Sequence, residues 1–301
     1  MRSKANRSHG ALLVLLAGVF WGSMGIFVRA LNRFGFGSVQ IACLRITVAA
    51  LLFALLLLLT DRKGFRIALR DVPLFLGLGL MSVLFFTVCY FRAIEIMPLS
   101  TAAILLYTSP IWVTLMAALF FHERLTGRKL LALGLAFLGC VLVSGVSGGG
   151  LTLYGLLVGL GAGVGYALYS ILGTVALRKY PPLTVTTWTF LIAAAGCWLV
   201  CDAAGLLRNL ADAPGGTLWW LIPLTGVVTA VIPYLAYTKG LQTTEAGRAA
   251  ILATVEPVVA TLFGTFAFHE KLTLPAALGI LLVLAAIALL NLPQKNRPRQ
   301  N

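Results

Sequence analysis

Ten long apolar runs constrain this chain more than any other feature of its sequence. A helix needs about 20 mostly apolar residues to cross the hydrocarbon core of a bilayer, and each run is of about that length. The segments between the runs are too short to form a separate soluble domain. We therefore predict an all-α polytopic membrane protein with ten transmembrane helices. The predicted spans are residues 11–30, 38–59, 72–93, 100–121, 129–146, 154–176, 183–203, 217–238, 246–268 and 274–292.

The composition agrees with this prediction. The 301 residues are 60% hydrophobic and only 11% charged, whereas a soluble domain is about 45–50% apolar and about 25% charged. This chain has too few polar side chains to cover a water-soluble globule. Its basic start, MRSKANRSH, resembles the beginning of a signal peptide. The long apolar run behind it has no clean A-x-A site, so we expect a retained first helix.

The basic residues predict the orientation of the chain in the membrane. Its net charge is +14, which would suggest a nucleic-acid partner in a soluble protein. If the N-terminus is cytoplasmic, 17 of the 23 Lys and Arg residues fall on the cytoplasmic side and 5 in outer loops. This distribution follows the positive-inside rule. We therefore predict that both termini are cytoplasmic, and we expect no nucleic-acid partner.

An internal repeat divides the chain in two. The stretch AAILLYTSPIWVTLMAALFFHERLT at 102–126 aligns without a gap to AAILATVEPVVATLFGTFAFHEKLT at 249–273, and 12 of the 25 positions are identical. A weaker match relates AGVFW at 17–21 to AGVGY at 162–166. We predict two five-helix repeats, residues 1–147 and 148–292, followed by a basic cytoplasmic tail at 293–301.

The odd number of helices in each repeat means that the second repeat enters the membrane from the opposite side. His122 and Glu123 are then expected at the cytoplasmic end of the fourth helix, and His269 and Glu270 at the outer end of the ninth. Two halves related in this way can open a central site to one side of the membrane and then to the other. The inverted repeat therefore favours an alternating-access transporter.

The repeated His-Glu pair is not expected to bind a metal. A zinc site of the HExxH type needs a second His four residues after the first, and both copies have Thr there. We expect no metal and no cofactor. We predict that Glu123 and Glu270 orient the turn between paired helices, with help from the adjacent Arg124 or Lys271. Direct contact with substrate is the alternative.

The sequence resembles the drug/metabolite transporter superfamily, specifically its EamA-type members, over essentially the whole chain. The features that carry the resemblance are ten helices in an inverted five-plus-five repeat, the start AGVFWGS, Arg45 in the second helix, and the Pro…HE-x-LT pattern in the fourth and ninth helices. The resemblance implies a multi-pass carrier in the lipid bilayer of the bacterial inner membrane, often an exporter of amino acids or other small metabolites. It does not identify the substrate. We expect a monomer or a homodimer.

Two ionisable residues lie inside predicted spans, where a charge costs about 2.5–3.5 kcal/mol on insertion scales. Glu256 is near the middle of the ninth span, and its counterpart in the first repeat is Ser109. We predict that Glu256 contacts a substrate amine or couples transport to protons; a carboxylate hydrogen-bonded for packing alone is the alternative. Arg45 in the second span either contacts substrate, extends outward to the interface, or holds a carbonyl at a helix end.

Prolines and aromatic residues predict a cavity between the fourth and ninth helices. Pro110 and Pro257 are equivalent, and each frees the carbonyl four residues earlier, which is tolerable only if it faces protein or a wet cavity. Pro233 does the same in the eighth span. A ring of aromatic residues suits an amino acid, an organic cation or an aromatic metabolite, and an interfacial belt is the alternative. The predicted aromatic lining is Trp21, Tyr90, Tyr107, Tyr166, Tyr169, Tyr234 and Tyr237.

Taken together, these patterns predict a secondary-active or facilitative carrier that moves a small amphipathic or zwitterionic metabolite outward, with any proton coupling through Glu256. No GxxxxGK[ST] phosphate-binding pattern occurs, so ATP hydrolysis by this chain is not expected. An intramembrane enzyme is one alternative, but it would need a nucleophile–base pair or clustered metal ligands. A signalling or scaffold protein that transports nothing is the other.

Overall fold

The computed structural model describes residues 4–145, 152–212 and 216–292, and these residues form a helical bundle. Ten of the helices in the described part of the chain are long and apolar enough to cross a membrane, which confirms the predicted fold class. The spans are Ser8–Asn32, Ser38–Thr60, Leu69–Ile96, Leu99–Phe121, Gly127–Ser144, Leu153–Ala176, Pro182–Val200, Thr217–Leu241, Ala246–Phe268 and Leu274–Asn291.

Half of the spans are single helices and half are interrupted. The uninterrupted ones are α3 (Ser38–Thr60), α8 (Gly127–Ser144), α9 (Leu153–Ala176), α10 (Pro182–Val200) and α16 (Leu274–Asn291). The interrupted ones consist of α1 (Lys4–Gly22) and α2 (Met24–Asn32); α4 (Val72–Leu76), the π-helical segment η3 (Gly77–Leu84) and α5 (Phe85–Ile96); α6 (Leu99–Leu106) and α7 (Ser109–Phe121); α12 (Thr217–Gly226), the π-helical segment η4 (Val227–Val231) and α13 (Ile232–Leu241); and α14 (Ala246–Ala253) and α15 (Val255–Phe268). The short helix α11 (Ala203–Asp212) precedes the eighth span.

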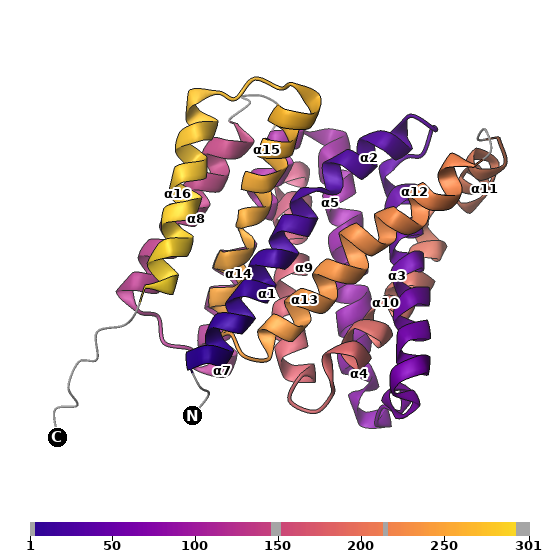
Figure 1. Cartoon of the computed structure of the whole chain (residues 1–301), viewed down its shortest axis with the longest axis horizontal. Coiled ribbons are helices and arrows are strands. Elements are labelled where there is room, and N and C mark those ends of the chain that lie inside the picture. Colours follow the sequence, from indigo (N-terminus) through magenta and orange to yellow (C-terminus); the bar gives the residue numbers. More distant parts are fainter. Residues whose placement is uncertain (1–3, 146–151, 213–215, 293–301) are drawn as a thin grey trace.

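The two repeats run in opposite directions. Figure 1 shows that α1 begins and α16 ends on the same face of the bundle, which we call the terminal face; the opposite face is the distal face. Helix α7 ends at the terminal face, whereas its counterpart α15 ends at the distal face (Figure 1). Two of the interruptions also match between the repeats, because the α6–α7 break corresponds to the α14–α15 break and η3 corresponds to η4; the α1–α2 break has no counterpart in the uninterrupted α9.

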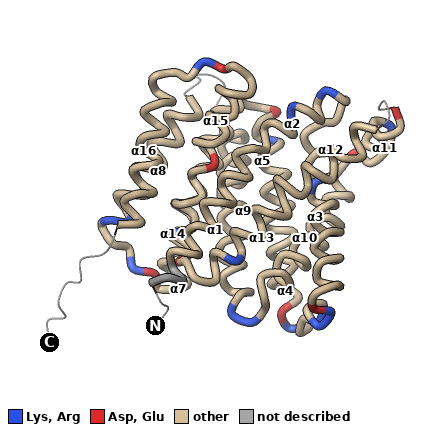
Figure 2. Tube along the Cα trace, viewed as in Figure 1, with Lys and Arg blue, Asp and Glu red and all other residues tan. Residues whose placement is uncertain are grey.

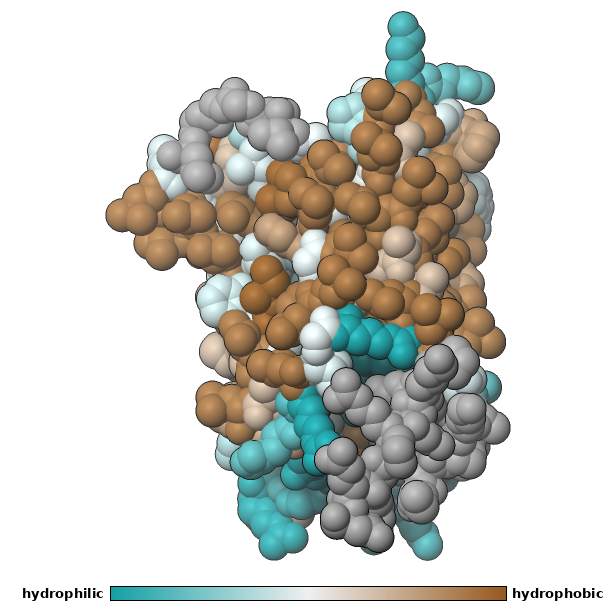
Figure 3. Space-filling model, turned by 90° about the vertical axis from the view of Figure 1, so that its left-hand side faces the viewer, coloured by the Kyte–Doolittle hydropathy of each residue, from teal (hydrophilic) through white to brown (hydrophobic). Residues whose placement is uncertain are grey.

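The outer surface of the bundle suits a lipid environment. Figure 3 shows a broad apolar surface on the side that carries α8 and α16, with polar side chains gathered toward its two ends. Lys, Arg, Asp and Glu lie mostly near the terminal and distal faces (Figure 2). Helices α8 and α16 pack against each other, and each exposes leucines on its outer side. These leucines are Leu130, Leu131, Leu138, Leu278, Leu281 and Leu284.

The repeated HE-x-LT motif stops one helix and starts the next. His122 and His269 have φ values of +53° and +54°, and they are the only non-glycine residues in the left-handed region within the described ranges. The amides of Glu123 and Glu270 bond back six positions, to the carbonyls of Ala117 and Gly264, so carbonyls at both helix ends have partners. Thr126 and Thr273 then cap the next helix, since their hydroxyls accept hydrogen bonds from the third amide of α8 and of α16. The motif therefore builds a tight helix–helix turn in both repeats.

This conformation makes a prediction for His122. A β-branched residue is strained at positive φ, so His122→Val is expected to lower the free energy of unfolding by about 1–2 kcal/mol. Glycine adopts this region freely, so His122→Gly should be nearly neutral. Thermal unfolding of the purified variants in detergent would measure both effects. Equal stability of the Val and Gly variants would contradict the assigned role of the left-handed turn.

Candidate functional site

Matched helix breaks in the fourth and ninth spans place backbone carbonyls at the centre of the bundle. Glycines of the neighbouring helices pack directly on these breaks. A Cβ added at Gly18 of α1 would lie 3.2 Å from the carbonyl oxygen of Ala253, and one added at Gly163 of α9 would lie 3.5 Å from that of Leu106. These are the carbonyls that the two prolines were expected to free. They face protein, as the membrane environment requires.

Glu256 lies in the first turn of α15, directly after the α14–α15 break at Thr254. Its side chain is half-buried, and Tyr166 in α9 donates a hydrogen bond of 3.4 Å from its hydroxyl to the Oε2 atom of Glu256. The carboxylate borders a small cavity of about 10 Å³, which is room for about one water molecule. The cavity is lined by Leu106, Tyr107, Ser109, Pro110, Tyr166, Ala250, Ala253, Thr254 and Glu256.

A second cavity of about 10 Å³ lies on the other side of Tyr166. Trp21 lines this cavity, and its ring centroid lies 5.2 Å from that of Tyr234, 5.4 Å from that of Tyr237 and 6.0 Å from that of Tyr166. Tyr166 lines both cavities, so it connects the aromatic cluster to the Glu256 carboxylate. The lining consists of Trp21, Ser82, Val83, Phe86, Gly165, Tyr166, Tyr169, Ser170, Tyr234 and Tyr237.

Two of the predicted aromatic residues are held by hydrogen bonds within the bundle. The hydroxyl of Tyr169 is 2.6 Å from that of Thr238, and the hydroxyl of Tyr237 is 2.7 Å from that of Ser170. Both rings are buried. These contacts fix the edges of the cavity and leave Tyr166 as the phenol that meets the carboxylate.

Tyr90 lies beside the site and lines neither cavity. Its ring stacks on Phe86 at 5.9 Å, and Phe86 meets Tyr166 edge-on at 5.5 Å. Tyr90 therefore contacts Phe86, which in turn contacts the site residue Tyr166. Pro110 and Ser109 do line the carboxylate cavity, on the side of the first repeat.

Arg45 is buried but does not line either cavity. Its Nη1 atom lies 3.4 Å from the carbonyl oxygen of Thr229 and 2.8 Å from the sulfur of Met24. The Thr229 carbonyl is the one that Pro233 was expected to free, because proline at that position offers no amide. Among the described residues, Arg45 and Glu256 form no ion pair. The geometry thus corresponds to the carbonyl-holding alternative for Arg45.

Sequence analysis did not identify five residues that line the aromatic cavity: Ser82, Val83, Phe86, Gly165 and Ser170. Ser82 lies in the π-helical segment of the third span and donates back to the carbonyl of Leu78. The sequence carries no signal for this interruption, because the apolar pattern of the third span continues through the π-helical segment. Among the described residues, no three His, Cys, Asp or Glu side chains lie close enough together to bind a metal.

Comparison with known proteins places this geometry in context. The sequence profile of the EamA-like transporter family matches residues 8–145 and again residues 153–292. Two uncharacterized transporters of Archaeoglobus fulgidus are similar over most of their length. The first is 29% identical, and the match covers 92% of this chain and 96% of the relative. The second is 31% identical, and the match covers 93% of this chain and 95% of the relative.

A shorter similarity relates this chain to the pseudopaline exporter CntI of Pseudomonas aeruginosa, which is 32% identical over 134 residues, 44% of this chain and 45% of the exporter. A solved crystal structure has the same fold, with a TM-score of 0.78 at 18% identity, covering 94% of this chain and 96% of the other. That structural likeness extends over the whole bundle, both repeats included.

The close packing of α1 on the helix break makes a prediction for Gly22. A Cβ at Gly22 would lie 2.7 Å from the carbonyl oxygen of Glu256, so Gly22→Ala should displace α15. We expect a loss of about 1–3 kcal/mol in stability, as for other overpacked sites. Gly25 is a matched control in the next turns of the same span, because a Cβ there meets nothing within 4 Å. Thermal unfolding in detergent would compare the two; an equal effect of Gly25→Ala would contradict the proposed contact.

Proposed function

Because the chain belongs to the EamA-like transporter family and is therefore a membrane transporter, we propose that it exports a small amphipathic or zwitterionic metabolite by alternating access. The substrate binds between the two repeats, beside Glu256 and Tyr166. Transport is secondary-active or facilitative. Where it is coupled to protons, Glu256 is the group that carries them.

The observation that carries this proposal is the position of the Glu256 carboxylate. It lies at a helix break, next to a cavity formed by both repeats, with one hydrogen bond from Tyr166. A carboxylate used only for packing would be expected to have more of its acceptor sites filled by protein donors. A half-buried carboxylate with one protein donor is suited to accept an amine or a proton in the transport cycle.

The aromatic residues support an amphipathic substrate. Trp21, Tyr166 and Tyr234 present ring faces and edges within one small space, and such rings bind apolar groups and cations. The cavities have a volume of only about 10 Å³ each in this conformation, so a metabolite does not fit until the halves separate. The name of the similar Pseudomonas aeruginosa protein as a pseudopaline exporter supports the outward direction.

The proposed location is the cell membrane, with the terminal face in the cytoplasm and both termini there. The basic residues support this orientation, because the loops assigned to the terminal face hold most of them. The bilayer is the solvent of the apolar belt, and a monomer contains both halves of the site. Association into a homodimer is compatible with this arrangement.

Replacing Glu256 tests the proposal. In proteoliposomes, Glu256→Gln is expected to reduce the flux of a transported amino acid or amine at least about tenfold, or to remove the pH dependence of that flux, since the amide has neither the charge nor the titration of the carboxylate. The substrate can be chosen from an untargeted comparison of metabolites in cells with and without the protein.

Glu95→Gln is the matched control, because Glu95 is an exposed carboxylate paired with Arg92 at the end of the third span. It removes one charge without touching the cavity, so the flux should stay within about twofold of wild type. Normal flux and an unchanged pH profile in the Glu256→Gln variant would show that the carboxylate neither binds substrate nor couples protons.

A further inference from the structure

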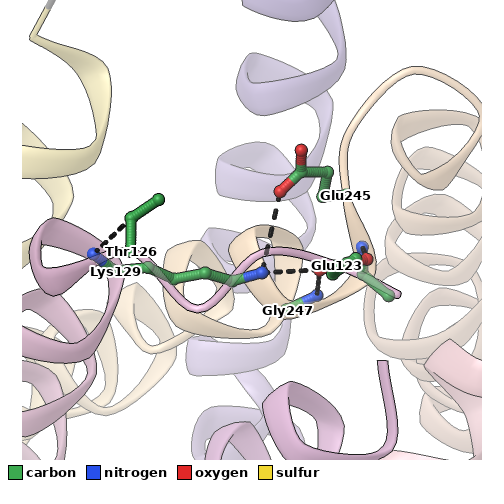
Figure 4. Close-up of polar contacts among 6 residues, drawn as sticks. Glu123, Thr126, Lys129, Glu245 and Gly247 are labelled. Carbon is green, nitrogen blue, oxygen red and sulfur yellow. Dashed lines mark hydrogen bonds and ion pairs between the residues drawn. The ribbon is translucent and has the colours of Figure 1, made fainter. Parts of the chain in front are cut away.

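At the terminal face, the carboxylate of Glu123 joins the two halves of the bundle (Figure 4). Glu123 follows α7 of the first repeat, and its Oε1 atom accepts a hydrogen bond of 2.9 Å from the amide of Ala246, the first residue of α14 in the second repeat. Its Oε2 atom lies 3.4 Å from the amide of Gly247. A carboxylate at this position satisfies helix amides and interacts favourably with the positive end of the helix dipole.

Lys129 completes this contact. Its ammonium group lies 2.5 Å from Glu123 and 3.6 Å from Glu245, and its side chain is only 5% exposed. The pair is therefore largely removed from water, although it lies at an edge of the bundle. The space is tight, because a Cβ at Gly247 would come within 2.8 Å of the Lys129 ammonium (Figure 4).

The packing of the broken helices differs between the two faces. At the terminal face, α7 of the fourth span packs against α14 of the ninth. At the distal face, the equivalent helices α6 and α15 make no comparable contact among the described residues. The exposure of the site agrees: Tyr90 and Tyr107, nearer the distal ends of their spans, are half-buried, whereas Tyr234 and Tyr237, nearer the terminal face, are buried.

Glu270, the repeat counterpart of Glu123, has a different partner. It pairs with Arg29 of α2, and both side chains are about half exposed, at 50% and 51%. The counterpart of Lys129 is Ala276, since the two repeats are offset by 147 positions. The glutamate of the motif therefore binds the opposite half of the bundle at the terminal face, as Glu123. At the distal face, as Glu270, it pairs with an exposed arginine instead.

We propose that Glu123 is a latch that holds the terminal face closed while the site faces the distal side, and that Glu270 becomes the equivalent latch on α6 when the distal face closes. This inference rests on the proposed transport function. In the second state, the Glu270 carboxylate leaves Arg29 and accepts hydrogen bonds from the amides of Leu99 and Ser100, the counterparts of Ala246 and Gly247.

The released Glu123 also has a partner available. Arg178 lies over the ring of Phe121 at 5.2 Å, just as Arg29 lies over the ring of Phe268 at 4.1 Å. Phe121 and Phe268 are equivalent in the repeat. When the terminal face opens, Glu123 pairs with Arg178 as Glu270 now pairs with Arg29. Each glutamate therefore alternates between the helix start of the opposite half and an exposed arginine.

Distances between spin labels on the full-length protein in nanodiscs would test the latch. One pair, at Gly127 and Gln242, reports the width of the terminal face, and its repeat-equivalent pair, at Leu274 and Glu95, reports that of the distal face. All four positions are exposed, and the native cysteines are replaced in every variant. We would compare wild type with Glu123→Gln, Gly247→Ala, Glu270→Gln and Ala276→Lys, and with Asp71→Asn as a control.

We expect Glu123→Gln to raise the ratio of terminal-open to terminal-closed molecules at least about tenfold, because it leaves Lys129 buried without its closest carboxylate. Gly247→Ala should shift the ratio in the same direction without changing any charge, by displacing Lys129. Glu270→Gln should shift it the opposite way. Ala276→Lys, which adds the lysine that the distal face lacks, should increase the terminal-open population.

Asp71→Asn is the control for a general loss of stability. Asp71 is also a largely buried carboxylate between the halves at the terminal face, bonded to Lys179 and Tyr180, but its side chain accepts no capping hydrogen bond from α4, the helix that follows it. Unchanged distances in Glu123→Gln, or an equal shift in Asp71→Asn, would overturn the latch. The distances are measured without substrate. An absence of flux through the wild-type protein would therefore overturn the proposed function. Normal flux through the wild type, together with unchanged spin-label distances in Glu123→Gln, would overturn the latch.

Discussion

Every backbone amide and carbonyl inside the hydrocarbon needs a partner, and the rest of the structure depends on how this chain meets that requirement. Pro110, Pro233 and Pro257 in the fourth, eighth and ninth spans each free a backbone carbonyl, and each of these three carbonyls is covered by protein. Gly18 and Gly163 allow neighbouring helices to lie against two of the breaks. Arg45 covers the carbonyl of Thr229 in the eighth span. The breaks can therefore lie only inside the bundle, which puts the candidate site at its centre.

The two repeats share a frame but differ in the few residues that carry charge. His122 and His269 make the same left-handed turn, and the two motif threonines cap the equivalent helices α8 and α16. The turn is thus complete without the glutamate, whose carboxylate is available for contacts between the halves. At the centre, Glu256 stands where the first repeat has Ser109. In the proposed cycle, the duplication would supply the symmetry and these replacements the chemistry.

The sequence predicted the ten spans, the inversion and the paired breaks, because apolar length, an odd repeat and proline are local signals. It also predicted that Glu256, Tyr166 and Trp21 belong to one central site, which stays a prediction; Tyr166 contacts Glu256, whereas Trp21 lines the neighbouring aromatic cavity. It did not identify the partners of Arg45, Glu123 or Glu270. Arg124 and Lys271, which are adjacent in sequence, were expected to help the two glutamates, but Lys129 and Arg29 pair with them instead. Partners across the halves depend on how the helices pack, and a single sequence does not encode that packing in any short pattern.

The buried pair of Glu123 and Lys129 has the energetic character that a reversible latch requires. The attraction between two buried charges is largely offset by the loss of their hydration, so a complete pair adds little net stability, while removal of one partner is costly. If the terminal face opens as proposed, both charges become hydrated together, so the complete pair separates at little cost. A carrier needs its two states to lie within a few kcal/mol of each other. A hydrophobic contact of the same size would favour one state more strongly, because its apolar surface gains nothing from water on opening.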